Sequence, residues 1–192
     1  MKKEYIILVG KSGSGKSEIT KYLKEDFGLI EAKTNTTRTP RFEGEDTHTF
    51  TNLNQYELDR RLGNIIADTY FCGNIYWTTK SQINESDIAI FDVLGVKKFN
   101  KIYDGDKEAV VFYIKTSLLD RVKFMQKRGD TARQIIKRVM HDAFAFKGVK
   151  EVSDMTIYNS RNVKPKFLAN KIVYDTKMIK TIRGFSKEYE EF

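Results

Sequence analysis

Eight residues near the N-terminus, Gly10-Lys11-Ser12-Gly13-Ser14-Gly15-Lys16-Ser17, match the pattern G-x-x-x-x-G-K-[ST]. A continuous apolar run from Tyr5 to Val9 precedes them and predicts a buried strand. Apolar residues at helical spacing follow them, from Ile19 to Phe27. Because a strand, a glycine-rich turn and a helix in this order form a loop that cradles phosphate groups, the chain is predicted to bind a nucleoside triphosphate.

The residue types in this phosphate loop suit its predicted ligand. Glycines let successive backbone N–H groups point toward phosphate oxygens, and the N-terminus of the following helix adds the positive end of its dipole. The Lys16 ammonium can reach the β- and γ-phosphates, and the Ser17 hydroxyl can bind Mg²⁺, which keeps most of its ligands as water. We therefore expect the triphosphate at Gly10, Ser12, Gly13, Ser14, Gly15, Lys16 and Ser17.

Strand and helix patterns alternate along most of the chain. Further strands are expected at 29–32, 87–92, 109–115 and 155–158, and helices at 95–103, 117–127, 131–146 and 166–180. This alternation predicts an α/β fold with three layers around a central parallel sheet. The segment 33–80 breaks the alternation, with a helix expected from Asn54 and strands at 64–70 and 74–78, and is interpreted as an inserted mixed α/β lobe.

Composition narrows the possible functions of the 192 residues. No apolar run approaches the roughly 18 residues that cross a bilayer. Cys72 is the only cysteine, which excludes an internal disulfide. We expect a cytoplasmic protein with no membrane partner. The formal net charge of +8 indicates an anionic partner, and the charge alone does not separate a nucleic acid from a nucleotide.

A second anion site is predicted in the run Thr36-Thr37-Arg38-Thr39-Pro40-Arg41. Pro40 fixes one backbone angle and favours an extended Thr39, so that Arg38 and Arg41 can converge on one anion. Guanidinium groups bind phosphate through two parallel hydrogen bonds. Two arginines here, together with the phosphate loop, indicate a second phosphate group besides those of the triphosphate.

With these two sites the sequence resembles guanylate kinase and its relatives among the nucleoside monophosphate kinases. The resemblance covers about residues 4–180 and rests on 10–17, 36–41, Gly73-Asn74-Ile75-Tyr76, Asp92 to Val96, Arg128-Gly129 and Tyr158-Asn159. It implies a P-loop kinase fold, and ATP-dependent phosphorylation of GMP, dGMP or a related (deoxy)nucleoside monophosphate. It also implies Mg²⁺, small nucleotides as partners without a nucleic acid, and a monomer or weak dimer.

The resemblance implies an organisation as well as an activity. One kinase domain, 1–192, would comprise a core of 1–32, 81–127 and 147–192, an acceptor lobe of 33–80 and a helical lid of about 128–146. The segment around the lid is rich in lysine and arginine, which suits a cover over a triphosphate.

In the acceptor lobe the resemblance assigns residues to the acceptor's phosphate. Arg38, Arg41 and Tyr76 would hold that phosphate. Glu45 would lie near it, and His48 stands where the family usually has a tyrosine.

At the acceptor base the sequence departs from the family. The hydroxyls of Thr34 and Thr78 would read the guanine edge, but the family's guanine-reading glutamate falls at Ala67, with Asp68 beside it. Since neighbours on a strand face opposite sides, Asp68 can replace the glutamate only if the strand is bulged. The acceptor could therefore carry a different or modified base, on a ribose or a deoxyribose.

For the donor side the resemblance implies four further roles. Asp92 would orient the waters around Mg²⁺ or the acceptor ribose, and Asn159 would lie beside the adenine. Arg128 and Arg138 would close with the lid over the transferring phosphoryl group. The catalytic positive charge would then come from Lys16, Arg38, Arg128 and Arg138.

Three alternatives stay open at this point. A sugar-phosphate kinase of the same superfamily, such as a ribose bisphosphate kinase, needs no base pocket, and Ala67 agrees with it. A non-catalytic binding module typically has a degraded phosphate loop, whereas Lys16 and Ser17 are intact here. A nucleic-acid-binding protein would agree with the charge, but no sequence signature of one is present.

Overall fold

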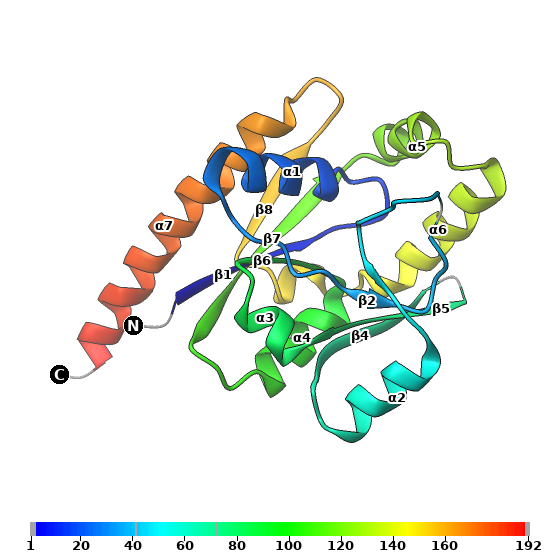
Figure 1. Ribbon diagram of the computed structural model, residues 1–192. Helices are drawn as coiled ribbons and strands as arrows, with labels where there is room; N and C mark the ends of the chain where they lie inside the picture. Colours follow the sequence, from blue (N-terminus) through cyan, green and yellow to red (C-terminus); the bar gives the residue numbers. More distant parts are fainter. Residues whose placement is uncertain (1–2, 41, 72, 191–192) are drawn as a thin grey trace.

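The computed structural model describes residues 3–40, 42–71 and 73–190, the side chains of 184–190 excepted. Its central sheet has the strand order β6-β1-β7-β8 and only parallel pairs. The strands are β1 (Lys3–Val9), β6 (Ile88–Phe91), β7 (Lys107–Thr116) and β8 (Met155–Asn159). The predicted α/β fold around a parallel sheet is therefore confirmed (Figure 1).

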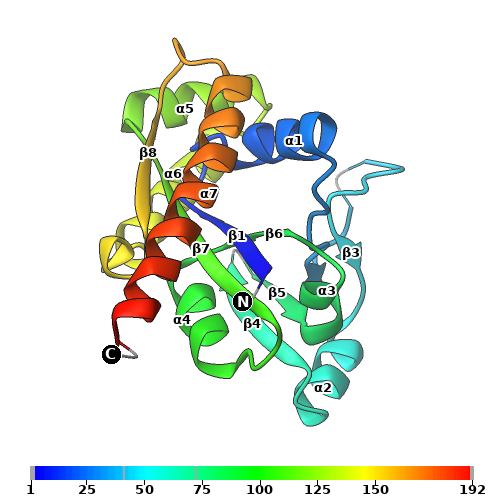
Figure 2. The same ribbon diagram turned by 90° about the vertical axis from the view of Figure 1, so that its left-hand side faces the viewer.

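Helices cover both faces of this sheet (Figure 2). Side chains alternate along β1: Ile6 and Leu8 join the apolar cluster of α1 (Lys16–Phe27) and α7 (Pro165–Glu190). Ile7 and Val9 belong to the opposite cluster, beneath α3 (Lys80–Asn84) and α4 (Val93–Ile102). Alternate side chains of β1 point to opposite faces of the sheet, and helices cover both faces. The domain therefore has three layers.

A second sheet, of order β3-β2-β5-β4, is built within residues 33–80. Its strands are β2 (Asn35–Thr36), β3 (Thr49–Phe50), β4 (Ile65–Phe71) and β5 (Asn74–Thr79), and α2 (Leu53–Arg61) packs beside β5 through Tyr56 and Trp77. β5 pairs antiparallel with both β2 and β4. The Trp77 indole N–H donates to Asp59 of α2 (2.8 Å), which fixes the helix to the sheet.

Two helices follow β7 and precede β8. They are α5 (Leu118–Lys127) and α6 (Ala132–Ala145), and a short 3₁₀ helix (Val149–Glu151) comes next. Ser117 begins α5 and Thr131 begins α6, each with a side-chain oxygen that accepts a backbone N–H of the first turn. Figure 1 shows α6 running from α5 toward the hairpin between β4 and β5.

Three of the predicted elements differ clearly in the structure. The strand predicted at 29–32 is a single bridge between Glu31 and Ile88, because the chain bonds there only to the start of β6. The helix expected from Asn54 begins at Leu53, since Asn52 is the residue that caps it (3.1 Å to the Gln55 N–H). Helix α7 continues beyond the predicted end at 180 to Glu190.

Among the described residues, no helix combines the length and the apolar character that a membrane span requires.

Candidate functional site

The phosphate loop joins the carboxyl end of β1 to α1, and its compactness depends on glycine. Gly13 and Gly15 have φ angles of 72° and 88°, a left-handed conformation that other residues rarely adopt. A Cβ atom on Gly15 would lie 2.4 Å from Asn159 Nδ2, and one on Gly13 would lie 2.6 Å from the carbonyl oxygen of Arg121. The loop therefore packs closely against β8 and α5, and these contacts fix the conformation of its backbone.

The Lys16 side chain folds back into this loop. Its ammonium donates to the carbonyl oxygens of Gly10 (2.5 Å) and Lys11 (3.2 Å). Burial lowers the pKa of Lys16 to about 8; Asp142 opposes the shift, and Arg121 and Arg128 add to it. The Lys16 amine is therefore held near the predicted phosphates. Because its pKa is lowered, its charge changes at a lower pH than that of an ordinary lysine.

Asn159, at the end of β8, supports the loop from the other side. Its side-chain amide donates to the Ser14 carbonyl oxygen (2.9 Å), which also accepts from the Thr116 hydroxyl (3.1 Å). The resemblance implied a place for Asn159 beside the donor adenine. The structure shows its amide engaged with the phosphate loop itself.

Asp92 lies next to the phosphate loop because β1 and β6 are adjacent and Val9 is the register partner of Phe91. It begins α4, where its Oδ1 accepts the Gly95 N–H (2.7 Å). The carboxyl ends of two neighbouring parallel strands thus bring Asp92 and Gly10 together, in the crevice where open α/β sheets bind ligands.

In the acceptor lobe, Arg38 is held by a buried carboxylate. Its two terminal nitrogens donate to the oxygens of Glu45 (2.8 and 3.2 Å), and its guanidinium lies 5.0 Å from the centre of the Phe50 ring. The side chains of Arg38 and Glu45 are 13% and 1% exposed. Tyr76 is close enough to interact electrostatically with Arg38. Arg41, the second predicted phosphate ligand, lies outside the described residues.

Three residues predicted near the base lie side by side on the second sheet. The Thr34 and Thr78 hydroxyls are 3.3 Å apart, and Ala67 is the register partner of Thr78. Two residues before Thr78 on β5, the Tyr76 ring packs on His48, with the ring centres 5.5 Å apart. Thr34, Ala67, Thr78, Tyr76 and His48 are thus brought together.

Asp68 is not brought to this group, which corrects its predicted role in binding the acceptor. Strand β4 does contain an irregularity, between Ile65 and Ala67, but it ends before Asp68. Asp68 therefore pairs with Trp77, on the face opposite to Ala67 and Thr78. There it accepts from the Tyr56 hydroxyl (3.0 Å) and pairs with Lys98 of α4.

The two predicted lid arginines share one carboxylate. Arg128 and Arg138 both pair with Asp130 (2.5 and 3.4 Å). The Arg138 guanidinium also lies 5.2 Å from the centre of the Phe71 ring, and the His141 ring meets the same phenyl edge to face at 4.7 Å. Because Phe71 ends β4, the lid helix α6 contacts the acceptor lobe in this structure.

Helix α6 also contacts the phosphate loop. Asp142 accepts hydrogen bonds from the backbone N–H (2.9 Å) and the hydroxyl (3.2 Å) of Ser12, and it pairs with Arg121 of α5. The sequence had marked Arg121 only as part of a basic segment, and it had not indicated Asp142, Asp130 or Phe71. The one available signal was that Asp142 follows Arg138 by four residues, on the same side of a helix.

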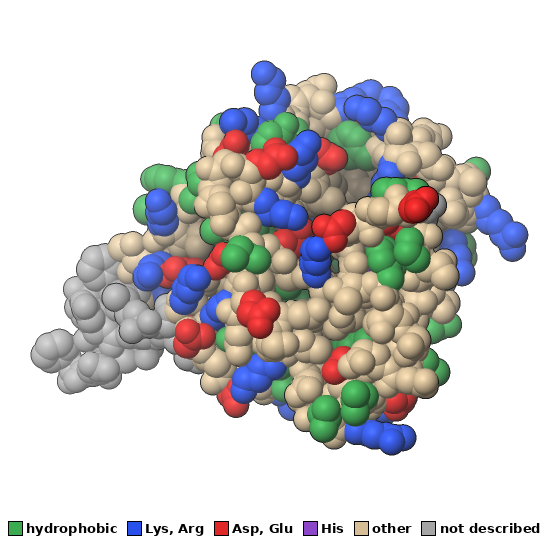
Figure 3. All heavy atoms as spheres, viewed as in Figure 1, with side chains coloured by type: hydrophobic (Ala, Val, Ile, Leu, Met, Phe, Trp, Pro, Cys, Tyr) green, Lys and Arg blue, Asp and Glu red, His purple; other side chains and the backbone are tan. Residues whose placement is uncertain are grey.

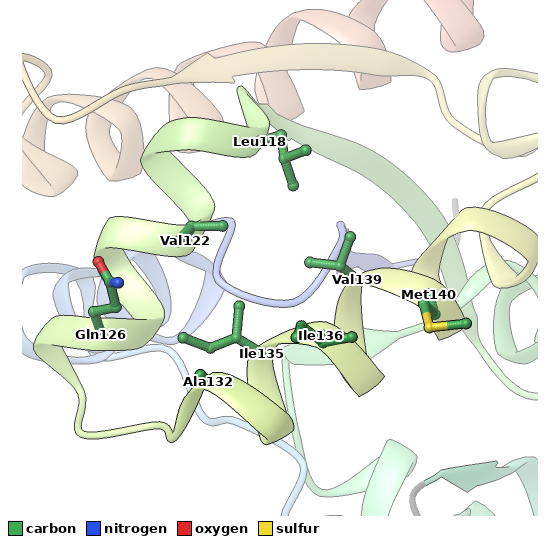
Figure 4. Close-up of a pocket in the computed structure, with 8 residues that line it drawn as sticks. All are labelled: Leu118, Val122, Gln126, Ala132, Ile135, Ile136, Val139 and Met140. Carbon is green, nitrogen blue, oxygen red and sulfur yellow. The ribbon is translucent and has the colours of Figure 1, made fainter.

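The surface around α5 and α6 has two features, basic side chains and an apolar groove. Lys and Arg side chains lie on the surface near α5 and α6 (Figure 3). Between these helices lies an open apolar groove of about 360 Å³ (Figure 4). The residues that line it include Leu118 and Val122 of α5 and Ile136 and Met140 of α6. None of the predicted site residues that the structure describes lines this groove.

The site suits a Mg²⁺ ion that arrives with a nucleotide. In the part of the chain that the structure describes, no three His, Cys, Asp or Glu side chains form a metal-binding group. Mg²⁺ on a triphosphate needs none, because phosphate and water supply most of its ligands. The Ser17 hydroxyl at the start of α1 and the nearby Asp92 carboxylate are the oxygen donors that such an ion prefers.

Comparison with known proteins places the chain among relatives of one kind. A sequence model of the family described as guanylate kinase matches residues 2–162. The guanylate kinase of Sus scrofa is 26% identical over 147 residues, 70% of this chain and 72% of the relative. That of Chlorobaculum tepidum is 28% identical over 142 residues, 69% and 72% of the two chains. The crystal structure of guanylate kinase from Anaplasma phagocytophilum shares the fold, with a TM-score of 0.62 at 20% identity over 93% of this chain and 88% of that one.

Proposed function

The chain belongs to the guanylate kinase family, and we propose that it transfers the γ-phosphoryl group of ATP to GMP, dGMP or a related (deoxy)nucleoside monophosphate. The family makes the chain a phosphotransferase and a nucleoside monophosphate kinase. The observation that carries the finer proposal is the position of α6. One face of this helix contacts the phosphate loop through Asp142 and the acceptor lobe through Arg138. A single element thus spans the two anion sites.

The chemistry needs positioning and charge more than it needs a reacting side chain. An oxygen of the acceptor's phosphate attacks the γ-phosphorus, and the bond from the γ-phosphorus to the bridging oxygen of ADP breaks. Lys16 stabilises the charge on the donor phosphates, while Arg38 holds the acceptor phosphate in line. Arg128 and Arg138 add positive charge from the lid. Bound Mg²⁺, held by Ser17 and through water by Asp92, would neutralise charge on the donor's phosphates.

The Arg38–Glu45 pair prepares the acceptor site before substrate binds. Within the described part of the chain, Arg38 Nε is buried without a hydrogen-bond partner, while both terminal nitrogens donate to Glu45. The guanidinium is therefore oriented yet keeps an unused donor for an anion. Tyr76, beside Arg38, can donate its hydroxyl to the same phosphate.

Closure of the lid has a second purpose in this proposal. Water competes with the acceptor phosphate as a nucleophile, and its reaction wastes ATP. The contact of Arg138 and His141 with Phe71 covers the space between lid and acceptor lobe. A covered site would favour transfer over hydrolysis.

The geometry at Ala67 favours a second candidate, a deoxynucleotide kinase for another or a modified base. The face that carries Thr34 and Thr78 receives a methyl group from β4 where a guanine reader would present a carboxylate. Asp68 lies on the opposite face and does not restore it. Hydroxyl groups both donate and accept, so Thr34 and Thr78 by themselves can bind several base edges.

The test is the rate of ADP formation from Mg-ATP with each ribo- and deoxynucleoside monophosphate, base-modified ones included. The best rates with GMP or dGMP would support guanine as the base, and a different winner would favour the second candidate. Lys16→Met should abolish turnover, whereas Lys21→Met, one turn farther along α1 and exposed, should not. ATP binding without any nucleotide acceptor would contradict the proposal and favour a sugar-phosphate acceptor.

A further inference from the structure

We propose that Asp142 is a positioning residue of the donor site: together with Arg121 it anchors the lid helix α6 on the phosphate loop and so fixes where Arg138 acts. This inference rests on the proposed function, because it concerns how the lid serves phosphoryl transfer. Asp142 would act through other residues and would not itself touch the reacting phosphoryl group.

The anchor is a closed set of hydrogen bonds among three elements. Asp142 of α6 accepts from the Ser12 N–H (2.9 Å) and the Ser12 hydroxyl (3.2 Å). Arg121 of α5 pairs with the same carboxylate, and its Nε donates to the Ser12 carbonyl oxygen (2.8 Å). The Arg121 and Asp142 side chains are only 6% and 3% exposed. Both polar groups of the Ser12 backbone are therefore held by the lid and α5.

Apolar packing contributes little to the position of α6. Its only buried residues are Ile135 and Asp142. Three large apolar side chains of the helix, Ile136, Met140 and Phe144, are 60%, 64% and 78% exposed. The groove between α5 and α6 stays open, as Figure 4 shows. The hydrogen bonds of Asp142 are thus the main contact that defines where α6 sits on the loop.

The spacing along α6 connects this anchor to the predicted catalytic lid. Arg138 precedes Asp142 by four residues, so the two side chains lie on the same side of the helix, one turn apart. Arg138 reaches Phe71 and Asp130 from there. A rotation or shift of α6 that follows loss of the Asp142 contact would move Arg138 with it, and misplacement by about 1 Å can reduce a rate about a hundredfold.

Charge gives Asp142 a second effect on the donor site. Its carboxylate opposes the burial that lowers the pKa of Lys16. The charged groups that act on Lys16 come from the elements packed against the loop: Asp142 of α6, Arg121 of α5 and Arg128 at the end of α5. Removal of the carboxylate charge would leave Arg121 and Arg128 near Lys16 without the opposing charge of Asp142.

Anchoring is favoured over a competing role, in which Asp142 occupies the loop as an internal anion that ATP displaces. A buried carboxylate with two donors on Ser12 and an arginine partner is costly to separate, since separation leaves uncompensated charges. An anchor keeps these bonds during turnover, whereas displacement would break all of them each time ATP binds. The two roles predict different results for a variant without the carboxylate: an anchor leaves the KM for ATP almost unchanged, whereas displacement predicts a lower KM.

The test uses Asp142→Asn in the full chain, with kcat and the KM for ATP measured on the best acceptor. We expect kcat to fall about tenfold to a hundredfold with a KM for ATP changed less than about threefold. More ATP should also be hydrolysed per transfer. Asp120→Asn is the matched control, because Asp120 is a buried aspartate of α5 whose ion-pair partner is Arg161.

A second variant separates anchoring from folding. In Arg121→Met/Asp142→Leu an apolar pair replaces the ion pair, an exchange that often preserves stability. It should fold and show the same fall in kcat. An unchanged kcat in both variants, or a lower KM for ATP with kcat intact, would overturn the inference while the wild type remains active. A wild type that phosphorylates no nucleotide would overturn the proposed function, and this inference with it.

Discussion

Ala67 and Asp68 are neighbours in sequence, yet their side chains lie on opposite faces of β4. The irregularity in β4 could have exchanged the faces of these two side chains, but it lies before Ala67. Asp68 therefore stays paired with Trp77. Under the proposed function, we expect base selection to depend on Ala67, which lies opposite Thr78. A carboxylate there would accept hydrogen bonds from two N–H groups of guanine.

The first prediction is that Ala67→Glu increases the preference for guanine. The ratio of kcat/KM for dGMP to that for the other deoxynucleoside monophosphates should rise by at least about tenfold, because analogues without the N–H groups leave the new carboxylate unpaired. Asp68→Asn is the matched control and should leave the ratio unchanged. A loss of guanine use in Asp68→Asn, with no effect of Ala67→Glu, would contradict the placement of the two residues.

The second prediction concerns pH. With a pKa lowered to about 8, Lys16 is charged below that pH and loses its proton as the pH rises through it. Because the charged form binds phosphate, kcat/KM for ATP should decline on the alkaline side with a midpoint near 8, since this ratio reports the free enzyme. Initial rates at a series of pH values check it. A profile that stays flat beyond about pH 9 would show that the Lys16 pKa is not lowered from that of an ordinary lysine.

At this scale the sequence predicted local chemistry well and distant partners poorly. The spacing of Gly10 to Ser17 indicated the phosphate loop because all of its residues lie in one short turn and at the start of the helix that follows. The partner of Ser12 is Asp142, 130 residues away, and no local pattern encodes that contact. The resemblance implied a place for Asn159 beside the adenine, whereas its bond to the loop depends on how β8 ends beside β7.

Elements with a strong apolar pattern were the ones that the sequence predicted. The runs that form β1 and β7 are apolar on both faces, and this pattern favours a buried strand in a parallel sheet. The two-residue strands β2 and β3 were not predicted, because two residues have no period and these strands exist through pairing with β5 and with each other. Helix boundaries moved by a few residues where a nearby side chain provided the better cap.

The third prediction is that Lys107 stabilises the end of α3. Its buried ammonium donates to the carbonyl oxygens of Ile83 (2.6 Å) and Asn84 (2.8 Å), and it also bonds that of Ser86. Lys107→Met removes the donor that these three carbonyl oxygens share, and should lower the free energy of unfolding by about 3 kcal/mol. Denaturant unfolding measures it, and the KM values of the folded variant should be unchanged.

Lys80→Met provides the comparison for this element. Lys80 forms an exposed pair with Asp104, and such pairs contribute at most about 1 kcal/mol. If both variants unfold at the same denaturant concentration as the wild type, Lys107 does not hold α3 in place.

At the scale of the whole molecule, one helix links two sites that the chain builds far apart in sequence. The phosphate loop is complete by residue 17, the acceptor lobe lies within 33–80, and α6 contacts both. The net charge of +8 agrees with the proposed function, in which two sets of phosphates would be held close together against their mutual repulsion. The sequence predicted the parts and the basic lid, whereas their contact through Phe71 and Ser12 required the structure.

The most direct test of this account follows the phosphoryl group itself. The wild-type chain is incubated with ATP labelled at the γ-phosphate, Mg²⁺ and a mixture of nucleoside monophosphates, and the labelled products are separated by chromatography. The account predicts that label appears in a nucleoside diphosphate, at its terminal phosphate, and that Arg38→Met prevents its appearance there. Label that remains in ATP, or that appears only as inorganic phosphate, would contradict the claim that the two sites form one phosphotransfer centre.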